Sequence, residues 1–299
     1  MATRENPVLA RPWLWMLPLG VVLVMVFVYP ILEILRLSFT DATMVAGEPY
    51  SYTAATYRSI VAGQDFADIL RVTVLFVLFS VVFQLLLGFA VALLVDTAAR
   101  RGLRGALVTR TVVLTAWAIP GVVIGVIWRL LYQDGPAGIL NYLGGMIGLS
   151  GNASFLSDPD AALISVTVAN IWRGTALSMI LMYAGLQSVS RELLEAARID
   201  GAGTFQAFRA VTWPVLLPLV AIDLITITVE TFNTFDMVMA LTGGGPGTAT
   251  EVLALGVYDQ MFNQLNLGRG ATMSVVLLLI NVIMVGFYFR YSARREATA

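Results

Sequence analysis

The stretch SRELLEAARIDGAGTFQAFRAVTWP occupies residues 190–214 and lies between two long apolar segments. Ser190 is a suitable N-cap for a short helix, and Gly201 can adopt the left-handed conformation that ends such a helix. Thr204 is a suitable cap for a second short helix that ends before Pro214. The stretch therefore predicts a helix–turn–helix elbow, rich in small residues, at one end of a membrane bundle.

Six apolar segments lie before and after this elbow in the sequence. Each is long enough to cross a bilayer at 1.5 Å per residue. Of the 299 residues 58% are hydrophobic and only 12% are charged, whereas a soluble domain is about 25% charged. We therefore predict an all-α polytopic membrane protein, with residues 1–299 forming one membrane domain and the first segment retained as a span. The segments are Trp13–Leu35, Phe66–Val95, Val108–Leu131, Ala161–Leu186, Pro214–Leu241 and Ala271–Phe289.

The arginines indicate the orientation, because loops rich in basic residues stay in the cytoplasm. They cluster before the first segment, after the second, after the fourth and after the sixth, and the other loops hold few. Both termini and the elbow are therefore predicted to be cytoplasmic. The clustered arginines are Arg4, Arg11, Arg100, Arg101, Arg104, Arg110, Arg191, Arg198, Arg209, Arg290, Arg294 and Arg295.

Several residue types are missing from the sequence, which has no His, no Cys and no Lys. An ordinary zinc site, a thiol nucleophile and a Ser–His dyad therefore lack their residues. A phosphate-binding loop that ends in Gly-Lys-Ser/Thr is excluded as well. We expect no catalytic residue, metal site or cofactor in this chain. If ATP drives the protein, another chain must hydrolyse it.

The elbow resembles the Glu-Ala-Ala motif of binding-protein-dependent ABC importers. Glu195-Ala196-Ala197 and Gly201 match at the right spacing, and Val211-x-Trp213-Pro214 matches the end of the motif with conservative departures. The resemblance implies the permease fold of type I ABC importers, with a cytoplasmic coupling loop at residues 187–213. It also implies that this loop docks in a groove of an ATPase subunit. The residues that the resemblance assigns to coupling are Glu195, Ala196, Ala197 and Gly201.

Two further stretches resemble the carbohydrate-uptake permeases of the maltose type: TFNTFD at residues 231–236 and LTGGGP at residues 241–246. This resemblance implies a permease in a bacterial or archaeal cell membrane that translocates a sugar or sugar-like solute. The implied partners are a second related permease and an extracytoplasmic solute-binding protein. Two ATP-binding cassette subunits, which bind ATP and Mg, complete the implied assembly.

Polar residues interrupt the apolar segments, and such residues usually face a bundle interior or a water-filled cavity. Asp223, Thr226, Glu230 and Asn233 recur at helical spacing on one stripe, and Arg173 falls near mid-membrane. One interpretation is a structural Arg173–Glu230 pair, and the other is a polar, partly aromatic solute pocket. The cavity positions come from two sources. Glu230 follows from the polar stripe, and the resemblance implies the others, which are Arg173, Gly174, Leu177, Phe232, Asn233 and Asp236.

Several alternatives remain open. The family often has uncharged residues at the positions of Arg173 and Asp236, so a glycerophosphodiester or another polar solute is possible. An ion-coupled secondary transporter with a relay through Asp223, Glu230 or Arg173 accounts for the charges but not for the elbow. An intramembrane aspartyl enzyme is disfavoured, because Asp223 and Asp236 are separated by about 20 Å along one predicted helix.

Overall fold

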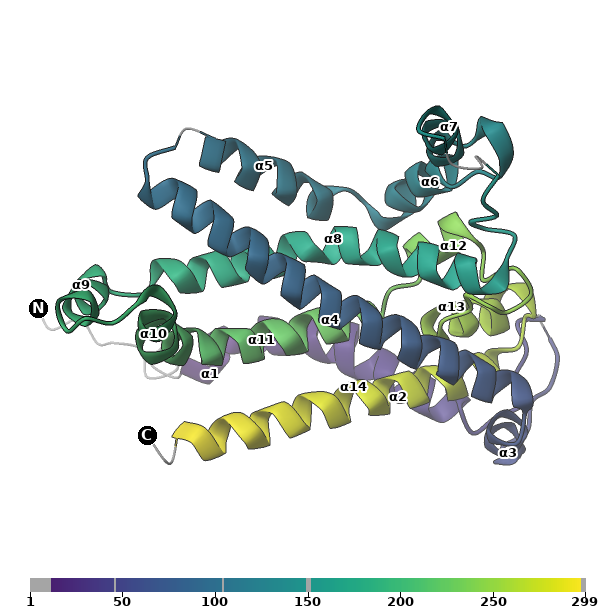
Figure 1. Ribbon diagram of the computed structural model, residues 1–299. Helices are drawn as coiled ribbons and strands as arrows, with labels where there is room; N and C mark the ends of the chain where they lie inside the picture. Colours follow the sequence, from purple (N-terminus) through teal and green to yellow (C-terminus); the bar gives the residue numbers. More distant parts are fainter. Residues whose placement is uncertain (1–11, 46, 104, 149–151, 297–299) are drawn as a thin grey trace, which may run out of the picture. The chain divides into compact units, whose positions relative to one another are not determined.

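The computed structural model describes residues 12–45, 47–103, 105–148 and 152–296 (Figure 1). Within these ranges the chain is built of helices, and its two antiparallel bridges belong to no strand. The chain divides into two compact units. One holds Met1–Gly63 with Val257–Val276, and the other holds Gln64–Gly256 with Leu277–Ala299. Arg4, Arg11 and Arg104, three of the arginines used for orientation, lie outside the described residues.

The smaller unit contains the first candidate span, Trp15–Leu37. A π-helical turn interrupts this span and ends immediately before Tyr29-Pro30. The hydroxyl of Thr272 donates to the carbonyl of Ser38 at 3.0 Å, so the last helix is tied to the end of the first span. The elements of this unit are α1 (Pro12–Leu23), α2 (Tyr29–Leu37), α3 (Ala55–Val61), the π-turn Asp259–Asn263 and the first part of α14 (Leu267–Glu296).

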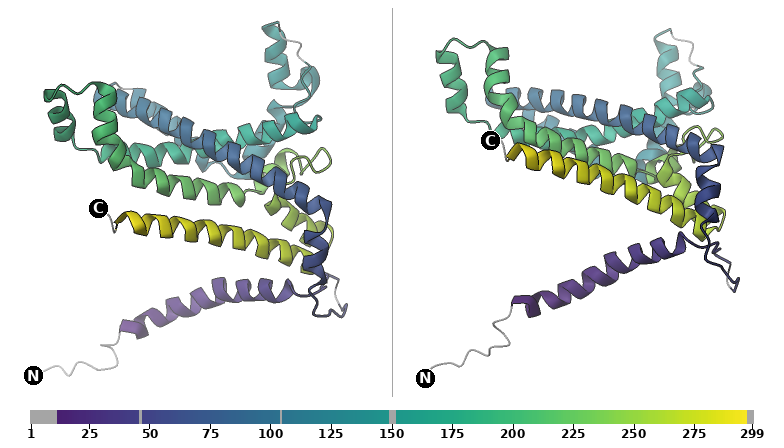
Figure 2. Two further views of the ribbon diagram at one scale, coloured as in Figure 1. Left: turned by 60° about the horizontal axis from the view of Figure 1, so that its bottom comes forward. Right: turned by 90° about the horizontal axis from the view of Figure 1, so that it is seen from below.

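Three long helices form the core of the larger unit: α4 (Gln64–Arg100), α8 (Pro159–Gln187) and α11 (Trp213–Phe232). α4 and α8 run in the same direction and α11 runs the opposite way (Figures 1 and 2). Small residues let the helices approach closely. A Cβ atom on Gly88 of α4 would lie 2.5 Å from the Cβ of Ser178 on α8.

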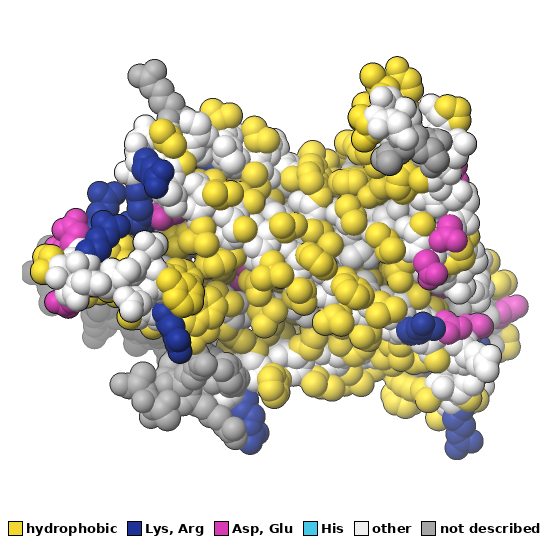
Figure 3. All heavy atoms as spheres, viewed as in Figure 1, with side chains coloured by type: hydrophobic (Ala, Val, Ile, Leu, Met, Phe, Trp, Pro, Cys, Tyr) yellow, Lys and Arg dark blue, Asp and Glu magenta, His cyan; other side chains and the backbone are white. Residues whose placement is uncertain are grey.

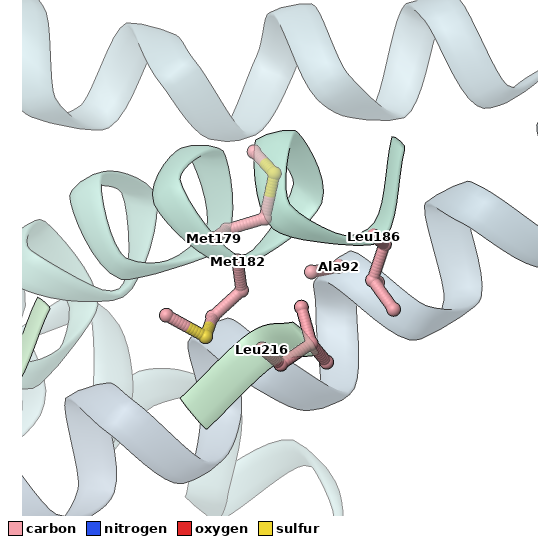
Figure 4. Close-up of a cluster of buried hydrophobic side chains, with 5 residues drawn as sticks. All are labelled: Ala92, Met179, Met182, Leu186 and Leu216. Carbon is pink, nitrogen blue, oxygen red and sulfur yellow. The ribbon is translucent and has the colours of Figure 1, made fainter. Parts of the chain in front are cut away.

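A buried apolar cluster lies where these three helices meet near the elbow (Figure 4). Each member is at most 3% exposed, so the cluster is a packed core rather than a lipid-facing surface. Phe208 of the elbow packs against it, which ties the elbow to the bundle. The members are Ala92 from α4, Met179, Met182 and Leu186 from α8, and Leu216 from α11.

The predicted third span is not one straight helix. It consists of α5 (Gly105–Ala118) and α6 (Gly121–Leu131), which meet at an angle of 102°. Pro120 causes the break, because proline disfavours a helical residue before it and lacks the N–H that would continue the helix. Among the described residues, five helices are long and apolar enough to cross a membrane, and the bent pair makes six if it counts as one crossing.

The predicted fifth span, Pro214–Leu241, is wrong at its C-terminal end. α11 ends at Phe232, and a separate short helix, α12 (Asp236–Leu241), follows after a break. The Asn233 side chain donates to the carbonyl of Val229 at 2.7 Å, and the Thr234 hydroxyl donates to that of Glu230 at 2.9 Å. Such side-chain bonds compete with the helical ladder.

Short helices cap the two ends of the larger unit. α9 (Arg191–Ile199) and α10 (Thr204–Ala207) lie at the elbow end (Figure 1). α7 (Ile139–Met146), α12 and α13 (Leu253–Tyr258) lie at the opposite end. In the space-filling view, hydrophobic side chains cover the length between the ends, and arginines gather over the elbow end (Figure 3).

Candidate functional site

The turn of the elbow is a Schellman motif. The N–H of Gly201 donates to the carbonyl of Arg198 at 3.1 Å, and the N–H of Ala202 donates to that of Ala197 at 2.9 Å. Gly201 has a φ of +81°, a conformation that favours glycine. This confirms the predicted helix end. Ser190 occupies the predicted N-cap position, but its side chain makes no capping hydrogen bond.

The second helix of the elbow differs from the prediction. Its cap is Gly203 rather than Thr204, and the side chain of Gln206 accepts a hydrogen bond from the Gly203 N–H at 2.9 Å. The helix also does not stop before Pro214. It continues through a π-turn at residues 208–212 into α11, giving one helical path from Thr204 to Phe232. The wider turn accommodates Pro214, which has no N–H to donate.

A polar network, here called the clamp, joins the ends of α4 and α8 beside the elbow. One carboxylate oxygen of Asp96 accepts a bond from Arg100 Nε at 2.6 Å, and the other accepts one from Gln187 Nε2 at 2.7 Å. Arg100 also donates to the carbonyl of Leu186 at 3.0 Å. Asp96 is only 7% exposed. The available sequence signal was an aspartate four residues before an arginine, at the end of an apolar segment.

The predicted coupling residues lie together on the surface of the elbow. Glu195, Ala196 and Gly201 are exposed, and Ala197 is partly buried. No side chain lies near Gly201, so its identity is required by its backbone conformation rather than by packing. The elbow surface therefore offers small residues at Ala196 and Gly201, and the exposed Glu195 stands on the side of α9 that faces the end of α4.

A narrow cavity lies within the larger unit, and its accessible space of about 10 Å³ is room for at most one water molecule. It brings together Arg173, Gly174 and Glu230, three of the residues predicted from the sequence. Leu177, Phe232, Asn233 and Asp236 are not among its lining residues in the described structure. The wall residues that the sequence did not single out are Gln84, Trp117, Asn170, Thr231 and Thr234.

Arg173 and Glu230 line the same cavity without pairing. Within the part of the chain that the structure describes, the ion pairs are Glu33–Arg36 and Asp96–Arg100. The structural interpretation, a buried Arg173–Glu230 bridge, is therefore wrong for this conformation. Glu230 is exposed in this chain.

Gly174 has a packing reason for its identity. The amide of Gln84 fills the space where a Cβ atom on residue 174 would lie. Gln84 Nε2 donates to the carbonyl of Asn170 at 3.0 Å. The Asn170 Nδ2 is buried and has no hydrogen-bond partner among the described residues. This wall of the cavity thus contains a buried donor that none of the described residues satisfies.

The predicted stripe on α11 divides into separate environments. Asp223 is fully buried and accepts a hydrogen bond from the Ser178 hydroxyl at 2.5 Å. Asn233 is exposed, lies at the C-cap of α11 and donates to Asn281 of α14 at 3.4 Å. Only Glu230 of these three lines the cavity. Helical spacing alone therefore predicted one continuous polar surface, whereas these residues lie in separate environments.

Asp236 lies at the first position of α12 rather than on α11. Its carboxylate packs against Gly121, which begins α6, where a side chain would collide with it. A carboxylate is stabilised near a helix N-terminus, and Asp236 is close to two of them. This position accounts for the close approach of α6 and α12.

The comparisons with known proteins agree with this architecture. The trehalose/maltose transport system permease of Thermococcus litoralis is 31% identical over 93% of this chain and 91% of that protein. The sn-glycerol-3-phosphate transport system permease of Agrobacterium fabrum is 32% identical over 95% of each chain. A bacterial alginate ABC transporter, solved in complex with an alginate pentasaccharide-bound periplasmic protein, has a chain that superposes with a TM-score of 0.80. That chain is 19% identical and the match covers 96% of both.

Residues 84–296 match the family described as the binding-protein-dependent transport system inner membrane component. This range includes the clamp, the cavity and the elbow. The relatives that match along nearly the whole chain are transport permeases rather than enzymes. The chain therefore belongs to the inner membrane components of binding-protein-dependent transport systems, the permeases of ABC importers.

Proposed function

We propose that this chain is one of two related permease subunits in an ATP-driven importer of a sugar or sugar-like solute. An extracytoplasmic binding protein delivers the solute, and two partner ATPase subunits bind ATP and Mg. The observation that carries the proposal is the elbow, a surface turn continuous with α11 that lies beside the clamp between α4 and α8. The elbow end and both termini face the cytoplasm of a bacterial or archaeal cell.

The elbow can transmit movement into the bundle along a single helix. The helical path from Thr204 to Glu230 is roughly 40 Å long at 1.5 Å per residue. When ATP binding closes the ATPase dimer, α9 follows the ATPase surface and α11 moves with it. Glu230 then shifts against Arg173 across the cavity. ATP hydrolysis and release return the elbow, and the cavity, to the inward-facing arrangement.

The cavity supplies the chemistry that recognition of a hydroxyl-rich solute needs. Its wall offers hydrogen-bond donors on Asn170 and Arg173, acceptors on Glu230, and an aromatic face on Trp117. Its accessible space of about 10 Å³ is far below the range typical of small-molecule sites, so the walls must separate before a solute enters. The second permease subunit therefore contributes the other wall, and the solute binds between the two subunits.

A second candidate is an importer of an anionic polar solute such as a glycerol phosphate or glycerophosphodiester. The specific observation is that Arg173 lines the cavity without an ion-pair partner among the described residues. A guanidinium with free donors matches a phosphate oxygen pair well. The related glycerol-3-phosphate permease is as similar to this chain as the trehalose/maltose one.

An ion-coupled carrier that works alone is the less favoured alternative. Asp223 is buried against Ser178 and does not line the cavity with Arg173 and Glu230. The charged residues of the bundle therefore lack the continuous path that a proton relay requires. The elbow also has no function in a carrier without ATPase subunits.

The test is uptake by proteoliposomes that contain the two permeases and the ATPase subunits, with the binding protein outside. We expect ATP-dependent uptake of a labelled disaccharide or of glycerol 3-phosphate, and none when the ATPase subunits are omitted. The same uptake by this chain alone, driven by a proton gradient, would overturn the proposal.

A further inference from the structure

A groove separates the last turn of α4 from the elbow helix α9. It has no part in the cavity described above, and residues from α4, α9 and the first residue of α10 form its walls. Four of its eight residues are arginines and only one is acidic. They are Thr97, Arg100, Arg101, Arg191, Leu194, Glu195, Arg198 and Thr204.

Three of the four arginines are not used by the protein itself. Arg100 bonds to Asp96 in the clamp. Arg101, Arg191 and Arg198 make no side-chain hydrogen bond or ion pair with any residue that the structure describes. Glu195 shares the groove but does not pair with them. The groove is therefore a convergence of guanidinium groups with free donors.

The groove lies beside apolar surface. Arg100 is the final residue of the long apolar helix α4, so the groove lies at one end of a candidate membrane span. Leu94 of α4 and Leu107 at the start of α5 are 70% and 64% exposed. The charged groove and these leucines together match a headgroup bound next to acyl chains.

We infer that this groove binds the headgroup of an anionic phospholipid. Arginine pairs with phosphate oxygens in a bidentate geometry, and basic pockets between membrane helices bind anionic headgroups. A phosphodiester held by Arg101, directly after α4, and by Arg191 of α9 joins the bundle to the elbow, parallel to the clamp. Anionic lipid therefore strengthens the attachment through which the elbow moves the bundle. The elbow's place at the cytoplasmic leaflet rests on the proposed function.

The test measures lipid retention by the complete transporter complex, exchanged into nanodiscs of phosphatidylglycerol mixed with phosphatidylcholine. Native mass spectrometry of the released complex counts the retained lipids. We expect the wild type to retain phosphatidylglycerol preferentially. Each basic residue near a membrane surface contributes roughly fivefold to the binding of anionic lipid, so Arg101→Gln with Arg191→Gln should weaken retention about 25-fold.

Two matched variants make the result specific. Arg209→Gln with Arg290→Gln removes two exposed arginines outside the groove and should leave lipid retention unchanged. Arg101→Lys with Arg191→Lys keeps the charge without the guanidinium fork and should give intermediate retention. Size-exclusion profiles and unfolding temperatures of each complex show whether the variants are folded.

Four results would overturn the inference. The first is a wild type with no preference for phosphatidylglycerol. The second is equal retention in the groove and control variants. The third is loss of ATPase subunits from the groove variant with lipid retention intact, which would assign the groove to the ATPase. The fourth is lipid-free stabilisation by inorganic phosphate that the groove variant loses, which would indicate a free-anion site. The measurement needs no transport, so its outcome is independent of the solute.

Discussion

Two polar contacts join α4 to α8, and they are built differently. At the elbow end, Asp96 satisfies Arg100 and Gln187 with both of its oxygens. At mid-bundle, Gln84 donates one bond to the backbone of α8, and Asn170 Nδ2 is left without a partner among the described residues. A buried donor without a partner costs roughly 1–3 kcal/mol. The closed network suits a fixed joint between two helices. The open one suits a surface whose hydrogen-bond partners change as a solute binds and leaves.

This contrast assigns different consequences to substitutions at the two places. Changes at the elbow end should uncouple the bundle from the ATPase whatever the solute is. Changes at mid-bundle should alter the rate for particular solutes and leave the ATPase attached.

The largest expected effect is loss of transport on Gly201→Pro. Proline cannot adopt the φ of +81° found at this position, and it lacks the N–H that bonds to Arg198. Glu195→Lys should act in the same direction, because it reverses the charge of an exposed elbow residue that the motif assigns to coupling. Uptake and ATPase co-purification measure both variants.

The control for this prediction is Gly203→Ala. Gly203 has a φ of −67°, which alanine adopts freely, so transport should persist. Normal ATPase association and normal stimulation of ATP hydrolysis in both Gly201→Pro and Glu195→Lys would show that the elbow is not the coupling surface.

The second effect is on stability. Asp96→Leu removes the acceptor for Arg100 and Gln187 and leaves a partly buried cation unpaired. Breaking a fully buried pair costs about 3–5 kcal/mol, but the Arg100 side chain is 28% exposed, so about 2 kcal/mol is expected. Unfolding of the purified complex in denaturant measures this. The double variant Asp96→Leu with Arg100→Leu should recover part of the loss. A double variant less stable than both single ones would contradict the fixed-joint interpretation.

The third prediction concerns Arg173 and Glu230. Because they form no ion pair, Arg173→Leu and Glu230→Leu should change stability additively, with a coupling free energy below about 0.5 kcal/mol. Arg173→Leu should reduce uptake of an anionic solute more than uptake of a neutral sugar. Thermal stability and uptake of both solutes, measured for the two single variants and the double one, check this. A rescue of stability in the double variant would restore the structural pair.

The smallest effects are expected at the end of α11. Phe232→Ala and Asn233→Ala should each slow uptake up to about fivefold, the equivalent of roughly 1 kcal/mol for one hydrogen bond or apolar contact. The affinity of the binding protein should be unchanged. Asn281→Ala is the matched control, because it removes the other half of the Asn233–Asn281 contact. If Asn281→Ala slows uptake as much as Asn233→Ala, the role of Asn233 is helix packing and not solute recognition.

Apolar length predicts the spans well, because a membrane helix must satisfy its backbone bonds internally over a fixed thickness. The breaks after Ala118 and Phe232 are harder to predict. Proline often lies inside membrane helices without ending them, as Pro18 and Pro218 do here. At the elbow, the left-handed conformation of Gly201 was predictable because a helix end depends on neighbouring residues in the sequence.

The polar contacts could not be predicted in the same way. Gln84 and Asn170 are 86 positions apart, and Asp96 and Gln187 are 91 apart. Whether Arg173 meets Glu230 depends on the rotation of α8 and α11, which small residues such as Gly174 determine through close packing. Spacing within one helix carries no information about that rotation.

The separation between these partners also sets an order of events during synthesis. α4 leaves the ribosome with Gln84 and Asp96 facing lipid or insertion machinery, because α8 does not yet exist. At 5–20 residues per second, roughly 4–18 s pass before Asn170 and Gln187 follow. During that interval the bent α5–α6 pair is synthesised before α8. Of the clamp residues, Arg100 alone can then pair with Asp96, because the two lie one turn apart on α4. Nascent α4 therefore holds two polar side chains in the membrane before their partners on α8 are made.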